Sequence, residues 1–417
     1  MSAFHAEGRS APHDVTPPGR SLRDGLRPEA LGPPDSGIVE IFNYGRNRQG
    51  LIPLWVGEGD LPTPGFIADA AARSFAAGET FYTYQRGIPE LRAAIAAYMT
   101  RCYGTPFADD PTPFAPERFH VTVGGMHALQ IAIRMMAGSG DEVLVPTPGW
   151  PNFRGAVMAA GGAVVEVPVQ FSGRGADGRW SLDIDRLAGA VTGRTRAIVV
   201  NSPSNPTGWI ASRADLEALL DLSRRHGLWI VADEIYGRLV YEAERAPSFH
   251  DVMAPDDRVL FVQTLSKNWA MTGWRVGWLE APPELGGTIE NLVQYSTSGV
   301  PVPLQRGAAM ALEEGEETVQ AMIARSRRSR DILCEALAGS GRLHFARPGG
   351  AFYLFARADG FADSRGLAFS MVDEIGVGVA PGSAFGEAGE GFMRLCFARD
   401  PASVAEVGRR LAAWLHR

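Results

Sequence analysis

The chain has 417 residues, enough for two or three domains, and its 45% hydrophobic and 21% charged residues are ordinary for a soluble globular protein. A formal net charge of −7 argues against a nucleic-acid-binding protein, because phosphate contacts need a basic face. The three cysteines are scattered and lack metal-ligand spacing, so we expect reduced thiols and no metal site. The start of the chain lacks the pattern of a secretory signal, and no apolar run approaches the roughly 18 residues that span a bilayer. These features predict a cytoplasmic protein with no membrane partner.

Shifts in composition and pattern along the chain predict its domains. Residues 1–37 are rich in proline, glycine and charge, so we expect a flexible N-terminal arm that a partner subunit could order. We expect residues 38–60 to be the N-terminal part of a small domain and residues 61–303 to be a large domain that begins with a helix near residues 65–77. Residues 304–417 are predicted to contain a linking helix and the small C-terminal domain.

The large domain alternates short apolar segments with helical patterns. The predicted strands are 119–123, 142–146, 163–167, 196–201, 228–232 and 258–263. The helices between them include residues 126–136, 151–160 and 213–225. Strands that alternate with helices indicate crossover connections, so the predicted fold class is α/β, with a mostly parallel sheet covered by helices on both faces.

The pattern changes in the C-terminal part of the chain. A long helical tract is predicted over residues 304–337, where charged runs are typical of a solvated face. Strands at 352–355 and 393–397, a helix near 367–374 and a closing helix follow. These elements predict a smaller α+β domain.

Lys267 and Arg275 form the most informative pair of residues. Lys267 follows an apolar strand and the hydroxyls of Thr264 and Ser266, and a glycine-rich turn leads on to Arg275. A lysine amine can form an imine, and a guanidinium can bind a phosphate through two hydrogen bonds. Both are requirements of pyridoxal 5'-phosphate, although a lysine and an arginine on a surface loop would give the same pattern.

An acidic residue ends another predicted strand. Asp233 lies at the carboxyl end of residues 228–232, where open α/β sheets bind ligands. A carboxylate there needs a partner, and a protonated pyridine nitrogen is one. Tyr236 could reach the phenolic oxygen of the same ring. The alternative is a helix-capping aspartate followed by a packed tyrosine.

Two turns after strands could also face a ligand. The turn over residues 201–208 has two prolines and a glycine, which would hold the Asn205 amide rigidly. Gly124 and Gly125 precede Met126 at the start of a helix, where backbone amides can bind an anion. The third glycine of a dinucleotide fingerprint is absent, and ordinary tight turns remain the alternative.

An aromatic and an arginine add weaker indications. Trp150 lies in another loop after a strand, where its face could stack on a heteroaromatic ring, although a buried tryptophan is usually a core residue. Arg394 lies within an apolar strand and needs a partner. A substrate carboxylate or an internal salt bridge would serve.

Together these motifs resemble the fold-type I, class I/II pyridoxal-phosphate-dependent aminotransferases. The matching segments, in chain order, are Gly57-Glu58-Gly59-Asp60, Tyr82 with Gly87 to Arg92, Gly124-Gly125, the Asn205-Pro206-Thr207-Gly208 turn, Asp233 with Tyr236, Ser266-Lys267 to Arg275, and Arg394. The resemblance implies a large domain with a mostly parallel sheet, a smaller α+β domain, and transfer of an amino group from an α-amino acid to a 2-oxo acid by a ping-pong mechanism.

The resemblance also implies how the chain holds the cofactor ring. Lys267 is the catalytic residue and carries the cofactor as an imine, and Asp233 pairs with the pyridine nitrogen. Asn205 and Tyr236 contact the ring oxygen. Trp150 stacks on the ring.

The resemblance also implies which residues hold the cofactor phosphate and the substrate carboxylate. The phosphate ligands would be Arg275, Thr264, Ser266 and the amides of Gly125 and Met126. Tyr82 would reach the phosphate in the neighbouring subunit, which implies a homodimer with shared sites. Arg394, Asn205 and the backbone of Gly57 would bind the α-carboxylate of the substrate.

Substrate choice is weakly encoded. Enzymes of this family that act on dicarboxylates place a second basic residue near the substrate side chain, sometimes directly after the paired glycines. Met126 stands at that position, and no arginine or lysine lies between Arg275 and Arg306. Neutral side chains are therefore favoured. A C–S β-lyase or another β-eliminating enzyme of the same fold would keep the same cofactor residues and is the alternative function. A nicotinamide-dependent oxidoreductase would not explain Lys267.

Overall fold

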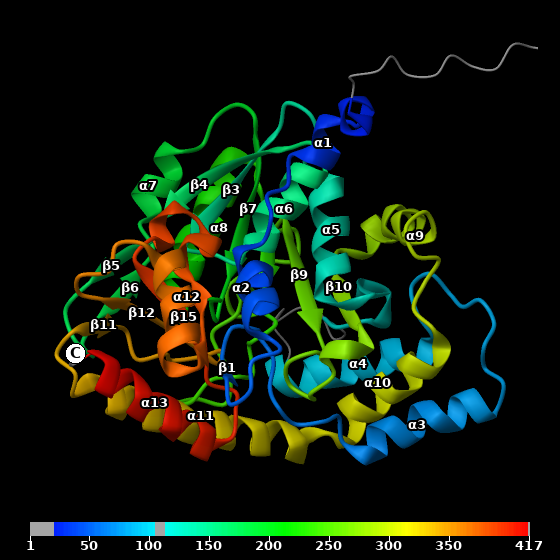
Figure 1. The fold of residues 1–417 in the computed structure, drawn as a ribbon. Coiled ribbons are helices and arrows are strands. Elements are labelled where there is room, and N and C mark those ends of the chain that lie inside the picture. Colours follow the sequence, from blue (N-terminus) through cyan, green and yellow to red (C-terminus); the bar gives the residue numbers. More distant parts are fainter. Residues whose placement is uncertain (1–20, 105–112, 416–417) are drawn as a thin grey trace, which may run out of the picture.

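The computed structural model describes residues 21–104 and 113–415 (Figure 1). Within them the larger sheet has seven strands in the order β2-β10-β9-β8-β7-β3-β4. These strands are β2 (Phe119–Thr122), β3 (Glu142–Thr147), β4 (Ala163–Pro168), β7 (Thr195–Asn201), β8 (Trp229–Asp233), β9 (Val259–Thr264) and β10 (Gly277–Glu280). All pairings are parallel except those of β10 with β2 and β9. The predicted α/β class and all six predicted strands are confirmed, whereas β10 was missed.

Helices cover both faces of this sheet because alternate strand residues point to opposite sides. In β8, Ile230 and Ala232 pack with leucines of α8, whereas Val231 belongs to the core cluster that contains the apolar residues of α5. The helices of this part are α3 (Gly65–Ala76), α4 (Pro89–Tyr103), α5 (Gly124–Met136), α6 (Pro151–Ala159), α7 (Ile184–Gly189), α8 (Arg213–His226), α9 (Gly286–Gln294) and α10 (Val302–Glu314). A small hairpin joins β5 (Gln170–Ser172) to β6 (Arg179–Ser181).

The C-terminal part forms a second, antiparallel sheet with the order β11-β12-β15-β14. Its strands are β11 (Leu343–Phe345), β12 (Tyr353–Ala358), β14 (Ala380–Pro381) and β15 (Phe392–Cys396). The helices around it are α11 (Glu316–Ala338), α12 (Ser364–Ile375) and α13 (Pro401–Leu415), and Figure 1 shows α11 and α13 side by side.

The single helical tract predicted for residues 304–337 is wrong in one respect. It is two helices, α10 and α11, which meet at Gly315. A Cβ at this glycine would overlap the Ala311 carbonyl oxygen and press on the Trp269 indole. The break therefore lies where the chain passes too close to its neighbours for a side chain.

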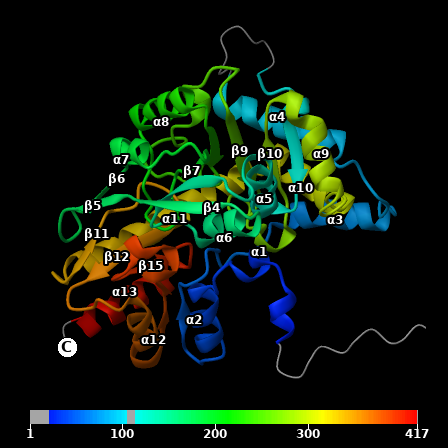
Figure 2. The ribbon, with the colours of Figure 1, turned by 90° about the horizontal axis from the view of Figure 1, so that it is seen from above.

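The N-terminal residues join the smaller sheet region. The described chain begins with a short 3-10 helix (Leu22–Gly25) and the one-turn helix α1 (Pro28–Leu31). Helix α2 (Gly37–Gly45) then leads to β1 (Ile52–Pro53), which pairs with β13 (Val377–Gly378). Figure 2 shows α2 beside α12. The first 20 residues of the predicted arm lie outside the described residues, and no helix within the described part is long and apolar enough to cross a membrane.

Candidate active site

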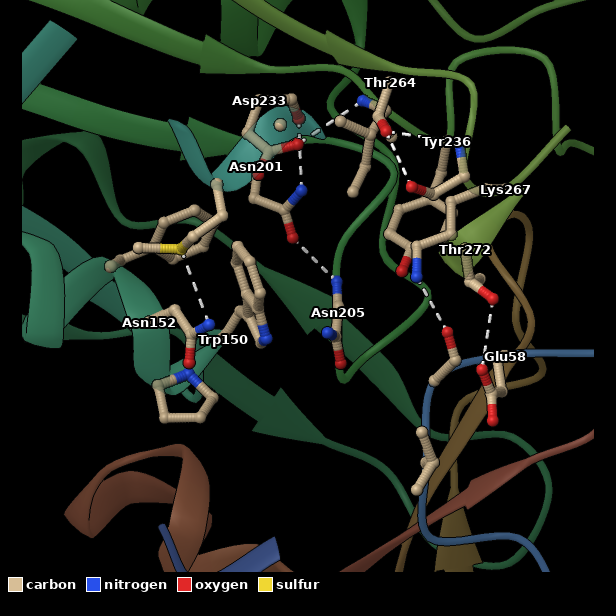
Figure 3. Close-up of a pocket in the computed structure, with 18 of the residues that line it drawn as sticks. Glu58, Trp150, Asn152, Asn201, Asn205, Asp233, Tyr236, Thr264, Lys267 and Thr272 are labelled. Atoms are coloured by element: carbon tan, nitrogen blue, oxygen red, sulfur yellow. Dashed lines mark hydrogen bonds between the residues drawn. The ribbon is translucent and has the colours of Figure 1, made fainter. Parts of the chain in front are cut away.

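The carboxyl ends of β7, β8 and β9 and the first turn of α5 surround a cavity of about 470 Å³ (Figure 3). The smaller sheet closes it with side chains from β12 and β15. Twelve residues predicted for the site line this cavity: Gly57, Gly125, Met126, Trp150, Asn205, Asp233, Tyr236, Thr264, Ser266, Lys267, Arg275 and Arg394. Tyr82 does not line it. The structure thus brings residues that lie up to several hundred positions apart around one space.

The Lys267 amine points into the cavity. Its Nζ donates a hydrogen bond to the Gly57 carbonyl oxygen at 2.8 Å. Burial lowers the pKa of Lys267 to about 8, and the nearby guanidinium groups of Arg394 and Arg275 act in the same direction. Roughly a tenth of this amine is therefore neutral at pH 7, far more than for an ordinary lysine, and a nucleophile or a general base requires the neutral form.

Lys267 is also the single lysine of the chain. We expect the full chain, labelled with ¹⁵N only in lysine and freed of cofactor, to give one side-chain amine resonance that titrates with a midpoint of about 8. The neutral form should predominate above that pH because burial penalises the charged form. A midpoint near the ordinary lysine value of about 10.4 would contradict the described environment.

Asp233 lies beneath the cavity and is 1% exposed. Burial raises the pKa of this carboxyl to about 7, although the Ile235 amide, at 3.4 Å from Oδ1, and the charge of Lys267 favour the ionised form. Asn201, the register partner of Asp233 on β7, donates to the Asp233 carbonyl oxygen at 3.1 Å. A cationic group in the cavity would restore full ionisation of Asp233.

The turn after β7 holds Asn205 against this framework. The backbone N–H of Asn205 donates to Oδ1 of Asn201 at 2.8 Å, and the Asn205 side chain faces the cavity (Figure 3). The sequence reasoning placed the turn correctly but assigned no role to Asn201. Only its place at the end of a predicted strand could have indicated one.

The Tyr236 hydroxyl lies 2.6 Å from the hydroxyl of Tyr353. Burial raises the pKa of both phenols above the ordinary value, so both hydroxyls remain protonated at neutral pH. Tyr353, in β12, also lies so close to Gly57 that a Cβ there would overlap the phenol oxygen. Tyr353 was missed, because a tyrosine within an apolar strand carries no motif.

Arg394 is 2% exposed and forms no ion pair with a carboxylate of the described residues. Its Nη1 donates to Oδ1 of Asn205 at 3.0 Å, its Nη2 donates to the Trp55 carbonyl, and its Nε has no hydrogen-bond partner in the described part of the chain. The guanidinium lies 4.6 Å from the ring centre of Tyr353. The internal salt bridge considered from sequence is thus not formed, and the charge is left for an anion in the cavity.

The other end of the cavity is a cradle of donors. Arg275 Nη1 donates to the Ser266 hydroxyl at 3.3 Å and to the Thr272 carbonyl at 2.7 Å, and the Thr264 hydroxyl donates to that of Ser266 at 2.8 Å. Helix α5 begins here, and the first amides of a helix lack intrahelical acceptors. Gly124 has φ +72°, and a Cβ on it would overlap the Arg275 guanidinium. The cradle therefore suits an anion such as a phosphate.

Trp150 and Tyr82 lie in different surroundings. Trp150 immediately precedes α6, lines the cavity and has its ring edge-to-face with Phe153 at 5.5 Å. Tyr82 is 95% exposed beside the segment 297–303, and Phe81 and Tyr295 are similarly exposed. In a single chain Tyr82 has no access to the cavity.

Comparisons with known proteins agree on one group. Residues 50–411 match the family model described as aminotransferase class I and II. The chain is 34% identical to aspartate/prephenate aminotransferase of Thermus thermophilus, with 94% of this chain and 98% of that protein covered, and 34% identical to aromatic-amino-acid aminotransferase 2 of Thermococcus litoralis, with 90% and 94% covered. The solved aspartate aminotransferase of Thermotoga maritima superposes with a TM-score of 0.85 at 31% identity, covering 94% of this chain and 100% of that one.

Proposed function

Because the chain belongs to the class I and II aminotransferases, we propose that the cavity around Lys267 is the active site in which it transfers the amino group of an α-amino acid to a 2-oxo acid. The observation that carries this assignment is that one cavity holds a partly neutral lysine amine, a buried carboxyl and a buried arginine that forms no ion pair with any residue the structure describes. Transamination needs a base, an anchor for the α-carboxylate and a counter-charge for an electron-accepting ring, and these three groups supply them.

The cofactor of this family is pyridoxal 5'-phosphate, and the residues present fit it. Lys267 would bond its aldehyde carbon, and Asp233, whose carboxyl lacks a strong cationic partner, would pair with the ring nitrogen. Asn205, Tyr236 and Trp150 would hold the ring. The donors that would hold the phosphate are Arg275, Thr264, Ser266 and the amides of Gly125 and Met126. When bound, the cofactor supplies an electron sink for the charge that is left when the α-proton departs.

Lys267 performs the proton transfers in this proposal. Once the substrate amino group had replaced Lys267 on the cofactor, the freed amine, oriented by the Gly57 carbonyl, would take the α-proton of the substrate at Nζ and return a proton to the neighbouring reacting carbon. The hydroxyl pair of Tyr236 and Tyr353 stays protonated and donates hydrogen bonds. Asp233 remains an anion as long as a cation faces it.

Arg394 fixes the substrate through its α-carboxylate. We expect Arg394→Ala to lower kcat/KM for all α-amino acids by roughly 30- to 5,000-fold, since loss of one partner of a buried charge pair costs about 2–5 kcal/mol. A primary amine without a carboxylate, such as benzylamine, should lose far less. Arg357→Ala is the matched control, because Arg357 lies on the same sheet with an exposed side chain. An equal loss for benzylamine and amino acids would contradict the carboxylate role.

The cavity favours amino acids with neutral side chains. Its cationic lining residues are Lys267, Arg275 and Arg394, and each already has a role in this proposal, while Met126 faces the same space. The purified enzyme is assayed with amino acids that have neutral, acidic or basic side chains as donors and with pyruvate or 2-oxoglutarate as acceptor. This assay tests both the reaction and the preference for neutral side chains. Keto-acid product and aminated acceptor in equal amounts are expected. Release of ammonia or a thiol instead would mark β-elimination.

We place the enzyme in the cytoplasm as a homodimer with shared sites. Exposed aromatic side chains at Phe81, Tyr82 and Tyr295 suit burial against a second copy. If Tyr82 serves the partner's site, a heterodimer of a Lys267→Ala chain and a Tyr82→Ala chain has one fully intact site. Co-expression with two different tags should then give heterodimers with about half the wild-type activity per dimer. Activity no higher than that of the two parent variants would contradict a shared site.

A further inference from the structure

A second polar cluster lies buried behind Asp233, outside the cavity. The four side chains of Glu234, Ser248, His250 and Glu280 are each 5% exposed or less. The Ser248 hydroxyl donates to Oε2 of Glu234 at 2.7 Å and lies 2.9 Å from Nδ1 of His250. On the other side of the imidazole, Nε2 lies 3.1 and 3.2 Å from the two carboxylate oxygens of Glu280. The four groups therefore form one continuous hydrogen-bonded chain.

The surroundings of this chain hold it rigidly. The His250 ring stacks on Phe261 with centroids 3.8 Å apart, and the rings of Tyr103 and Phe114 pack around it. The Phe249 amide donates to Oε1 of Glu234 at 3.1 Å. The charged and titratable groups that face the chain from neighbouring elements are Arg118, 3.5 Å from Glu280, the Arg245–Asp251 ion pair, and Tyr103.

Counting hydrogens along the chain shows that it must hold one extra proton. The three links, from Glu280 to His250, from His250 to Ser248 and from Ser248 to Glu234, need three hydrogens, whereas the Ser248 hydroxyl and a neutral His250 supply two. Although burial opposes it, the charge and hydrogen bond of His250 and the nearby Arg118 hold the pKa of Glu280 below its ordinary value, so Glu280 is ionised. The third hydrogen is therefore on His250, as an imidazolium, or on Glu234, as a neutral acid. In both arrangements His250 Nε2 donates to Glu280 and the total charge is the same, so the proton can move without a change in net charge.

We propose that Glu234, Ser248, His250 and Glu280 share this proton, and that Glu234 is a positioning residue that sets the charge next to Asp233. This inference rests on the proposed role of Asp233 as the partner of the ring nitrogen. The transfer is balanced: the proton on His250 Nδ1 passes to Ser248 Oγ as the Ser248 hydroxyl proton passes to Glu234 Oε2. The negative charge of Glu234, next to Asp233, is present when His250 holds the proton and absent when Glu234 holds it.

The electrostatics support a proton that reaches Glu234. Burial raises the pKa of Glu234 to about 7, so this carboxyl can hold a proton near neutral pH, as the shared arrangement requires. The negative charge of Glu234 is also one of the influences that raise the pKa of Asp233. A proton on Glu234 would therefore strengthen Asp233 as an anion.

The position of the proton can be read directly from His250. In the full chain labelled with ¹⁵N-histidine, with His250→Asn used for assignment, the wild-type Nδ1 resonance is expected midway between protonated and unprotonated values. In Glu234→Gln the glutamine amide donates to Ser248, so Ser248 must donate to His250 and Nδ1 should become fully unprotonated. Identical Nδ1 shifts in both proteins would overturn the shared proton. This measurement needs no cofactor, so it stands even if the proposed function fails.

The effect of the Glu234 charge on the neighbouring site needs a second measurement, on the cofactor-loaded enzyme. Glu234→Gln should lower the pH midpoint of the visible absorbance by about half a unit or more, because a nearby negative charge is removed. Ser248→Ala should act in the same direction, and Ser248→Thr, which keeps the hydroxyl, should restore the wild-type midpoint.

Glu142→Gln is the matched control, since Glu142 is a buried, hydrogen-bonded glutamate at the amino end of β3. Its midpoint should equal that of the wild type. A Glu234→Gln midpoint equal to that of this control would show that Glu234 has only a structural role and would overturn the proposal. If Glu234→Gln fails to fold, Ser248→Ala and Ser248→Thr decide the question. A Ser248→Ala midpoint equal to that of the Glu142→Gln control would then overturn the proposal.

Discussion

Replacement of Lys267 by alanine is expected to abolish transamination, with kcat lowered by roughly 10⁴-fold or more. The amine would be lost both as the covalent attachment point and as the base that moves the proton. No other lysine exists in the chain to substitute for it. Single-turnover mixing of enzyme with an amino acid, followed by absorbance, measures the loss without interference from product release.

Two further measurements separate the roles of this residue. Lys267→Arg keeps a positive charge but cannot supply a neutral amine, so it should be as inactive as the alanine variant. Borohydride reduction of the cofactor-loaded wild type, followed by peptide mapping, should place the pyridoxyl label at Lys267. Near-normal turnover of either variant, or a label elsewhere, would refute the proposed active site.

Replacement of Asp233 by asparagine is expected to lower kcat by roughly 10²–10³-fold while the cofactor still binds, because the phosphate cradle is untouched. In the proposed site the carboxylate would keep the ring nitrogen protonated, which an amide could not do. Pre-steady-state measurement of α-proton removal from a deuterated amino acid should show that this step has become slower and fully rate-limiting.

A matched control and a chemical rescue test the reason for that loss. Asp257→Asn removes another buried carboxylate, one that pairs with Arg224 away from the cavity, and should leave kcat unchanged. A cofactor analogue that carries a methyl group on the ring nitrogen has a permanent positive charge, so it should restore part of the activity of Asp233→Asn. If the analogue gives no gain, Asp233 acts in some way other than through the ring nitrogen.

Local sequence patterns predicted the framework of the fold. Six strands of the large sheet appeared as short apolar runs between helical segments, and all of them except β4 are largely buried. Strand β10 (Gly277–Glu280) was missed because its four residues follow the glycine-rich turn that ends at Arg275 and look like its continuation. The break at Gly315 was missed because it depends on the approach of Trp269, which is distant in the sequence.

The site was predictable to the extent that its residues lie at strand ends. Asp233 ends β8 and Asn205 lies in the turn after β7, so the parallel pairing of these strands brings the two residues together. Tyr353 comes from the smaller sheet, and only the packing of one sheet region against the other places it beside Tyr236. Whether Arg394 had an internal partner was likewise undecidable from sequence, because it depends on which carboxylates the fold brings near.

The chain's lone ε-amino group has a practical consequence for anyone who handles this protein. Reagents that couple to primary amines, such as succinimidyl esters, can modify only the chain's α-amine and Lys267. With the cofactor bound to Lys267, attachment to a sensor surface or a dye would occur at the N-terminal amine alone, giving a uniformly oriented and still active enzyme. Without the cofactor, the same reagent would inactivate the protein in proportion to the label it takes up at that one side chain.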